Sequence, residues 1–280
     1  MYDIDTVWIV VILFISMVLA IEIGSRLGLR PRGSVSAGFT THVNTIAASL
    51  VGILALLLGF AFSSSLHRFD DRSEAVVDEA NAIGTAYLRS HLLPASVRSD
   101  VQKLLREYLD LRVQTSTVPL SDQSERELLV AKASRTQTAL WDYALQAAEQ
   151  DPNPVTSGLF IQSLNEVIDS LGKRDAALRR HVPEVALLLL YGTFLMAGAI
   201  VGYSAGVAGY RASFITYIMV ALITLLVFII LDLDRPRRGL IEVSQESLID
   251  LQAKIKVSMR ADARQPIPAD VQRPAGTERR

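Results

Sequence analysis

The second of the chain's apolar stretches carries the side chains best spaced to line a path for ions. Gly52, Leu56 and Phe60 recur every four residues, so on a helix they share one face. Hydroxyl groups lie near that face and ionisable side chains end the stretch: Ser49, Ser63, Ser64, then His67, Arg68 and Asp71. An apolar constriction between polar ends is typical of a pore that closes by excluding water. The same spacing also suits a stripe that faces lipid or a neighbouring helix.

Two acidic pairs offer a second kind of chemistry, cation binding. Asp70 and Asp71 follow the second apolar stretch, and Asp232 and Asp234 follow the fourth. Carboxylates from two helix ends supply the oxygen ligands that Ca²⁺ prefers. Alternatively, the acids neutralise the arginines beside them, which are Arg68, Arg72, Arg235, Arg237 and Arg238. We favour neutralisation and predict no metal, with Asp232 and Asp234 as the remaining candidates.

Catalytic motifs are missing from the sequence. It has no HExxH pair, no phosphate-binding glycine loop that ends in Lys-Ser or Lys-Thr, and no serine in a Gly-x-Ser-x-Gly turn. Cysteine is absent, which removes thiolate nucleophiles and cysteine zinc sites. The four histidines, His42, His67, His91 and His181, lack metal-ligand spacing. We therefore expect neither an enzyme nor a cofactor.

The composition indicates a membrane protein. Half of the 280 residues are hydrophobic, and the mean hydropathy is +0.30. Four stretches approach the roughly 20 apolar residues that a membrane-spanning helix needs, at about 7–24, 45–66, 184–207 and 212–231. Acidic rather than basic residues precede the first stretch, so we expect a retained helix instead of a signal peptide. The formal net charge of -1 gives no basic field for nucleic acid.

Two features within the spans concern packing. Gly198, Gly202 and Gly206 form a smooth ridge on the third span, which lets helices approach closely, within one subunit or between subunits. Glu22 and Arg26 lie one helical turn apart near the end of the first span. We interpret them as an interfacial pair, with a buried functional acid as the alternative.

The polar region between the second and third spans, about 67–182, repeats its apolar residues at helical intervals. One face of its first helix carries Val76, Ala80, Ile83 and Tyr87. Three more helices are expected at about 96–113, 122–149 and 157–180, with Ser96 or Ser99 as the N-cap of the first of these. No alternating strand pattern competes, so the predicted fold is all-α.

These elements give a domain plan. Residues 1–66 form the first transmembrane helix pair, 67–182 a helical domain, and 183–232 the second transmembrane pair. Pro236 and Gly239 mark a turn, after which an amphipathic segment completes 233–260. Residues 261–280 lack periodicity, and we expect a disordered tail.

The distribution of basic residues predicts the orientation. Four spans place both termini and the helical domain on one side. That side carries Arg68, Arg72, Lys173, Arg174, Arg179, Arg180, Arg235, Arg237 and Arg238 near the spans. The opposite side carries Arg26, Arg30, Arg32 and Arg211. The positive-inside rule therefore favours cytoplasmic termini and a cytoplasmic helical domain.

The stretch at 49–72, SLVGILALLLGFAFSSSLHRFDDR, resembles the pore helix of bestrophins. That family shows a similar Ser-Leu-x-Gly-Ile start, a Gly-Phe end, and an Arg-aromatic-x-Glu step, where Asp71 stands for the Glu. EANAIGTAYLR at 79–89 and LDLDRPRRG at 231–239 are similar to a bacterial domain-of-unknown-function family labelled bestrophin-like. This second resemblance spans nearly the whole chain.

Bestrophins are pentameric ion channels with four spans per subunit and cytoplasmic termini. The resemblance therefore implies a homo-oligomer in a bacterial inner membrane, with Leu56 and Phe60 at the pore's neck and Gly52 at its wider end. Two departures limit the transfer: Ala61 and Phe62 follow the Gly-Phe step where bestrophins usually have polar residues, and the acidic calcium-binding cluster is reduced to Asp232 and Asp234.

The expected function is an oligomeric, pentameric channel or channel-like protein whose partners are its own copies, the lipid bilayer and small inorganic ions. Anions are favoured because His67 and Arg68 lie at the inner mouth and no acidic residue lies within the second span. The alternative is a non-conducting membrane scaffold or sensor whose helical domain binds a partner.

Overall fold

The computed structural model describes residues 5–30, 37–118, 122–211, 213–235 and 240–262, and within these residues the chain is helical without a strand. The elements are α1 (Thr6–Gly28), α2 (Ala37–Arg89), the 3₁₀ turn η1 (Ser90–Leu92), α3 (Ala95–Thr117), α4 (Gln123–Gln150), the π-helical turn η2 (Pro154–Gly158), α5 (Leu159–Arg179), α6 (Glu184–Val207), α7 (Phe214–Asp234) and α8 (Glu246–Asp262). The all-α prediction is confirmed for this part of the chain.

Four helical stretches are long and apolar enough to cross a membrane. They lie within Thr6–Gly28, Gly38–Leu92, Pro154–Val207 and Phe214–Asp234. The predicted stretches at 7–24, 45–66 and 184–207 fall in α1, α2 and α6, and the fourth, predicted at 212–231, overlaps α7, which begins at Phe214. The prediction of four membrane-spanning helices is therefore supported by both length and composition.

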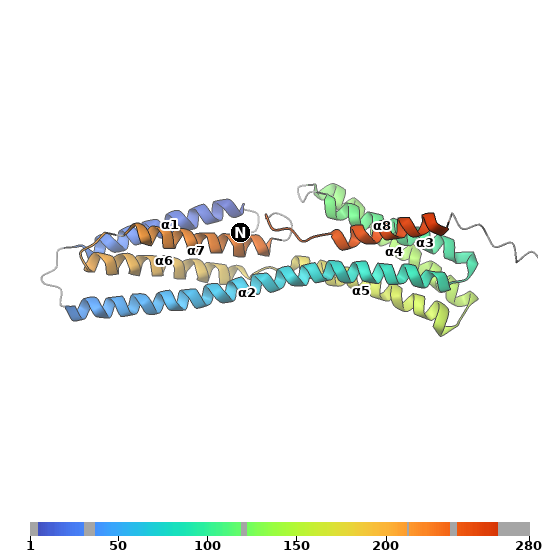
Figure 1. Cartoon of the computed structure of the whole chain (residues 1–280), viewed down its shortest axis with the longest axis horizontal. Helices are drawn as coiled ribbons and strands as arrows, with labels where there is room; N and C mark the ends of the chain where they lie inside the picture. Colours follow the sequence, from blue (N-terminus) through green and yellow to red (C-terminus); the bar gives the residue numbers. More distant parts are fainter. Residues whose placement is uncertain (1–4, 31–36, 119–121, 212, 236–239, 263–280) are drawn as a thin grey trace, which may run out of the picture. The chain divides into compact units, whose positions relative to one another are not determined.

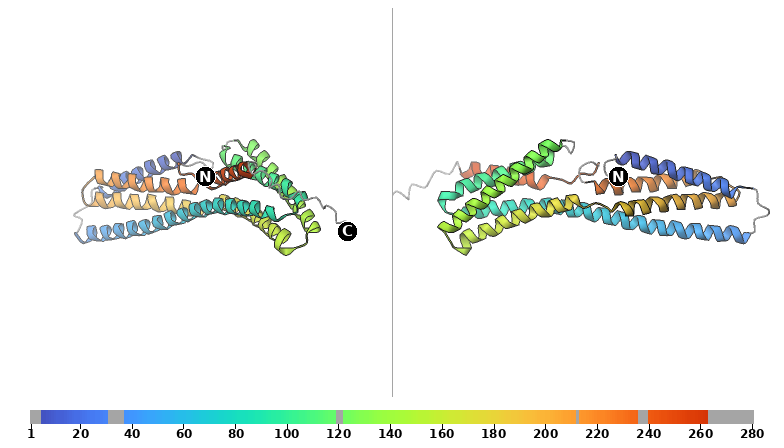
Figure 2. Two further views of the ribbon diagram at one scale, coloured as in Figure 1. Left: turned by 45° about the vertical axis from the view of Figure 1, so that its right-hand side comes forward. Right: turned by 180° about the vertical axis from the view of Figure 1, so that it is seen from behind.

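The chain forms two compact units, made of residues 1–75 with 173–243 and of residues 76–172 with 244–280. In the first unit, α1, α6, α7 and the first part of α2 run side by side (Figure 1; Figure 2). The second unit contains α3, α4, α8, the larger part of α5 and the remaining part of α2. Because no glycine or proline lies between Phe60 and Gly84, nothing in the sequence interrupts α2, and the second span continues directly into the polar region.

Glycines hold α1 against α6 in the first unit. A Cβ at Gly198 would lie 3.5 Å from the carbonyl oxygen of Met17, and a Cβ at Gly202 or Gly206 would overlap a carbonyl oxygen of α1. The ridge therefore packs within the chain. The contact is reciprocal, since Gly24 and Gly28 of α1 approach the backbone of α6 as closely. The contact of Gly24 and Gly28 was not predicted from the sequence, although their Gly-x-x-x-Gly spacing is typical of such an interface.

The second unit buries the helix face that the sequence predicts. Val76, Ala80, Ile83 and Tyr87 are all buried, which confirms that face. The N-cap prediction for α3 is wrong. Pro94 occupies that position, since its fixed φ and missing N–H suit a helix start, and the Ser96 hydroxyl instead donates to Gln150 Oε1 at 2.5 Å.

Several sequence predictions lie outside the described residues. They concern Arg32, the turn at Pro236 and Gly239, the arginines Arg237 and Arg238, and residues 263–280 of the predicted tail. The predicted start of the tail at residue 261 is wrong, because α8 continues to Asp262.

Candidate functional site

The apolar part of α2 has two faces of opposite exposure. Leu54 and Leu58 are 5% and 7% exposed and belong to the core shared with α1, α6 and α7. Leu56 and Phe60 lie on another face and are 58% and 64% exposed. The described chain therefore leaves the face of α2 that carries Leu56 and Phe60 mostly uncovered by its own helices.

The other residues that the sequence marks as pore-lining share this exposure. Ser49, Gly52, Ser63 and Ser64 are all exposed. A Cβ added at Gly52 would meet no atom of the described chain within 4 Å. The Ser49 hydroxyl donates to the Thr45 carbonyl at 2.9 Å, so within a membrane this group is satisfied by its own helix. We call the exposed face formed by Ser49, Gly52, Leu56, Phe60, Ser63 and Ser64 the α2 stripe.

The residues marked as the mouth divide into two kinds. His67 and Asp71 are exposed and continue the α2 stripe. Arg68 is partly buried, and its Nε donates to Asp234 Oδ1 at 2.8 Å. Its charge is therefore offset by a carboxylate from the end of α7.

The acids considered for metal binding lie in different surroundings. Asp70 and Asp71 are exposed, whereas Asp232 and Asp234 are buried. The two oxygens of Asp232 accept from the backbone N–H groups of Leu240 and Ile241 at 3.0 and 2.9 Å, and Asp234 Oδ2 accepts from Val182 N at 3.1 Å. The carboxylates of Asp232 and Asp234 therefore hold backbone segments in place through these hydrogen bonds. The described residues contain no group of three or more His, Cys, Asp or Glu that could hold a metal.

Arg72 is the residue whose importance the sequence analysis missed. Its side chain is among the largest fully buried ones in the described chain, and its guanidinium donates to backbone carbonyls at the ends of α5 and α7. The available signal was the spacing of Arg68 and Arg72, which places two arginines on one helix face next to a span.

A groove of about 300 Å³ runs beside the α2 stripe in the first unit. From α2 it is lined by Leu57, Phe60, Ala61, Ser64 and Arg68. The opposite wall comes mainly from the start of α6, with Ile230 of α7. Phe60 thus lies at the border between the groove and the exposed face.

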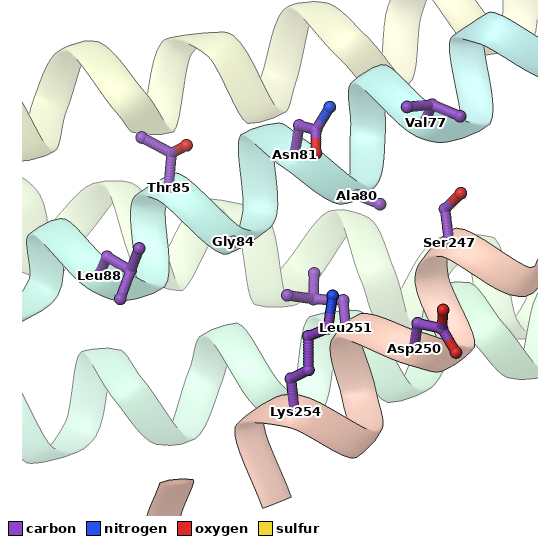
Figure 3. Close-up of a pocket in the computed structure, with 10 residues that line it drawn as sticks. All are labelled: Val77, Ala80, Asn81, Gly84, Thr85, Leu88, Ser247, Asp250, Leu251 and Lys254. Atoms are coloured by element: carbon purple, nitrogen blue, oxygen red, sulfur yellow. The ribbon is translucent and has the colours of Figure 1, made fainter.

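A second groove, of about 390 Å³, lies in the other unit between α2 and α8 (Figure 3). Its α2 wall runs from Val77 to Leu88, and its α8 wall from Ser247 to Lys254. The two helices approach at Gly84, where an added Cβ would lie 3.2 Å from Leu251 Cδ1. None of the site residues marked by the sequence lines this groove.

Residues 7–248 match the model of the Bestrophin-like domain. Similar solved structures include three of a bacterial Bestrophin homolog from Klebsiella pneumoniae. A tyrosine-to-alanine mutant is 18% identical with a TM-score of 0.62, over 90% of this chain and 97% of that one. An aspartate-to-alanine mutant is 17% identical with a TM-score of 0.62, over 92% and 99%. The structure solved by Zn-SAD phasing is 16% identical with a TM-score of 0.57, over 90% and 99%. At these identities the likeness establishes the fold. A comparison with curated proteins gave no match.

Proposed function

Because the chain belongs to the Bestrophin-like domain family, we propose that it is an ion channel or channel-like membrane protein assembled from several copies. The observation that carries this proposal is the α2 stripe, where Leu56 and Phe60 are more than half exposed beside the buried Leu54 and Leu58. One chain supplies only one wall of a path. An arrangement of α2 helices around a shared axis, as a pentamer, would close the path and make Leu56 and Phe60 its apolar neck.

The composition of the α2 stripe supports a path in preference to a purely lipid-facing surface. The exposed face mixes the apolar Leu56 and Phe60 with Gly52 and with serines at both ends. Hydroxyl groups and a glycine backbone can contact water or a partly hydrated ion, and a bulky apolar ring between them can exclude water. A surface that contacts only lipid would not need glycine and serines on both sides of the apolar residues.

The ion preference depends on the mouth. The anion preference predicted from the sequence depends on His67 and Arg68, but Arg68 is paired with Asp234 in the structure. His67 remains exposed, and the exposed Asp70 and Asp71 follow it within about one turn. The proposal keeps anions as the favoured class because α2 carries no acid between residues 37 and 69. Reversal potentials under a salt gradient measure this preference directly.

The proposed orientation places both termini and the helical unit in the cytoplasm of a bacterium, with the spans in its inner membrane. The excess of Lys and Arg at the span ends on the side of the helical unit supports it. Protease digestion of intact spheroplasts tests it, because a cytoplasmic α3–α4 region would be protected until the membrane is opened.

Flux through liposomes tests the main proposal. Purified protein should carry salt across the bilayer, and Phe60→Ala combined with Leu56→Ala should increase that flux several-fold, since the neck becomes wider and easier to wet. The channel proposal fails if the native protein passes no ions and the double variant passes none either.

The second candidate function is a non-conducting scaffold or sensor whose helical unit binds a partner. The groove between α2 and α8 favours it, because this groove exposes apolar side chains such as Leu88, which is 70% exposed. Cysteine scanning separates the two functions in this naturally cysteine-free chain. Water-borne thiol reagents should label every third or fourth position from 49 to 64 in a channel, and none of them in a scaffold whose α2 is surrounded by lipid or protein.

A further inference from the structure

Arg72 joins α2 to the ends of two other helices. Its side chain is buried, and the guanidinium donates four hydrogen bonds to backbone carbonyls. Nε donates to Ala177 O at 3.2 Å, Nη1 to Leu233 O at 3.0 Å, and Nη2 to Arg180 O at 2.7 Å and Asp234 O at 3.2 Å. Ala177 lies in the last turn of α5 and Arg180 directly follows that helix, while Leu233 and Asp234 are the last two residues of α7.

These carbonyls suit a buried cation. The last four carbonyls of a helix have no donor within the helix, and the aligned peptide dipoles make this end partially negative. The guanidinium therefore supplies donors to some of these carbonyls at the ends of both helices. In return, the carbonyls satisfy a charge that would be costly to bury without acceptors.

Arg68 extends this attachment by one turn of α2. Besides its ion pair with Asp234, its Nη1 donates to Ser64 Oγ at 2.9 Å and its Nη2 to Ser65 Oγ at 3.3 Å. The second oxygen of Asp234 accepts from Val182 N, just before α6 begins. We call Arg68, Arg72 and Asp234 the α2 anchor.

The apolar side chains of α2 specify its rotation poorly by comparison, although Asn44, directly before them, accepts a hydrogen bond from the Ser204 hydroxyl of α6. The side chains that face the core, such as Leu54 and Leu58, are of the same kind as the exposed Ile53 and Leu56. In a bilayer an apolar side chain gains little from facing another helix instead of lipid. A shift by one residue turns a helix by about 100°, and it would remove the Arg72 guanidinium from its four carbonyls.

We infer that the α2 anchor fixes the rotation of α2 about its own axis and thereby selects Leu56 and Phe60 as the outward face. Arg72 is then a positioning residue for the neck. The inference rests on the proposed function for what this face does. The rotation is a property of the chain and can be measured whether or not ions pass.

Spin labels read the rotation directly. Single cysteines replace Leu54, Leu56, Leu58 and Phe60 in the cysteine-free chain, and each is spin-labelled in liposomes. Collisions are measured with oxygen, which concentrates in lipid, and with a water-soluble nickel chelate. In the native background, labels at 56 and 60 should collide with either oxygen or the nickel chelate several-fold more often than labels at 54 and 58. We call this difference in collision rate the contrast. With Arg72→Gln this contrast should fall until the four positions are similar.

Three further variants make the result specific. Arg89→Gln is the matched control, because Arg89 lies on the same helix and donates to the carbonyl of Leu159 at 3.1 Å in the other unit. It should keep the native contrast. Arg72→Lys keeps the positive charge but lacks the planar guanidinium with its several donors, so it should retain only part of the native contrast. Asp234→Asn removes the ion pair with almost no change in size, and it should reduce the contrast even if Arg72→Gln does not fold.

The outcomes separate the inference from the proposed function. An unchanged contrast in folded Arg72→Gln, or in Asp234→Asn, overturns the inference and leaves the channel proposal standing. Labels at 56 and 60 that meet oxygen but never the nickel chelate place this face in lipid, which overturns the channel proposal. In that case loss of the contrast in Arg72→Gln still supports the inference, and its persistence still overturns it.

Discussion

Phe60 and Leu58 lie two positions apart on α2 and are 64% and 7% exposed. This difference follows from the helical period, since two positions on a helix are about 200° apart. Leu58 belongs to the core that α2 shares with α1, α6 and α7, whereas Phe60 lies at the border of that core, beside the groove along α6. An exposed aromatic ring in a membrane helix is stable in lipid, and it is also stable against the same ring from other copies around an axis.

The polarity of residue 60 should therefore control flux. We expect Phe60→Ser to raise ion flux through liposomes several-fold, because a hydroxyl group allows water to fill an apolar constriction. Phe60→Leu should stay near the native flux, since it keeps the constriction apolar. Leu88→Ser is the matched control, because Leu88 lies on the same helix and is 70% exposed, but outside the apolar stretch. A serine variant with native flux would remove Phe60 from the neck.

A second residue-scale prediction concerns the buried ion pair of the helical unit. Arg112 Nε donates to Glu79 Oε1 at 2.5 Å, and the two side chains are 6% and 0% exposed. Glu79→Gln removes the carboxylate that pairs with the buried charge of Arg112, and breaking a buried pair in this way should cost about 3–5 kcal/mol. Thermal unfolding in detergent, followed by circular dichroism, should show a clear fall in midpoint. Asp100→Asn, at an exposed acid, should change it little.

At the scale of the elements, α1 and α6 are held together by shape. Five glycines, Gly24 and Gly28 of α1 with Gly198, Gly202 and Gly206 of α6, bring the two backbones into contact. Burial of apolar surface provides little drive inside a bilayer, so close van der Waals packing along these glycines carries the association. The association of α1 with α6 therefore depends mainly on the absence of side chains at these glycines.

One added methyl group should separate these helices. Gly202→Ala places a Cβ against the carbonyl of Ile21, and overpacking of this kind should cost about 1–3 kcal/mol. Gly192→Ala is the control on the same helix, since its Cβ would meet no described atom within 4 Å. That variant should be neutral or slightly stabilising. The expected readout is a lower thermal midpoint in detergent for Gly202→Ala alone, and equal midpoints would contradict the packing.

The elements were largely predictable, and the contacts between them were not. Hydropathy and helical periodicity are local properties, so the four spans and the buried face at Val76 and Ile83 follow from short windows of sequence. The acceptors of Arg72 are separated from it by 105 to 162 residues. In the sequence, an arginine beside a span has the same appearance whether its side chain faces solvent or binds the ends of two distant helices. Only the packed structure distinguishes these cases.

At the scale of the whole molecule, the α2 stripe raises the question of what covers it. The residues of the α2 stripe are exposed along the helix, whereas Leu54 and Leu58 pack into the core that α2 shares with α1, α6 and α7. In the proposed pentamer, copies of α2 surround an axis, so equivalent residues of different copies lie close together while core residues stay apart. A lone subunit or a dimer cannot enclose a path of this kind.

Cross-linking at residue 60 should therefore show the number of copies. In liposomes, Phe60→Cys treated with a short thiol-reactive bifunctional reagent should give a ladder of products that ends at the pentamer, because each Cys lies near the axis. Leu58→Cys is the matched control, since its side chain faces the core of its own subunit and should give only the single chain. A ladder ending at the dimer, or equal products from both positions, would exclude an axial path lined by α2. The native protein's mass in detergent, measured by light scattering, should agree with the top of the ladder.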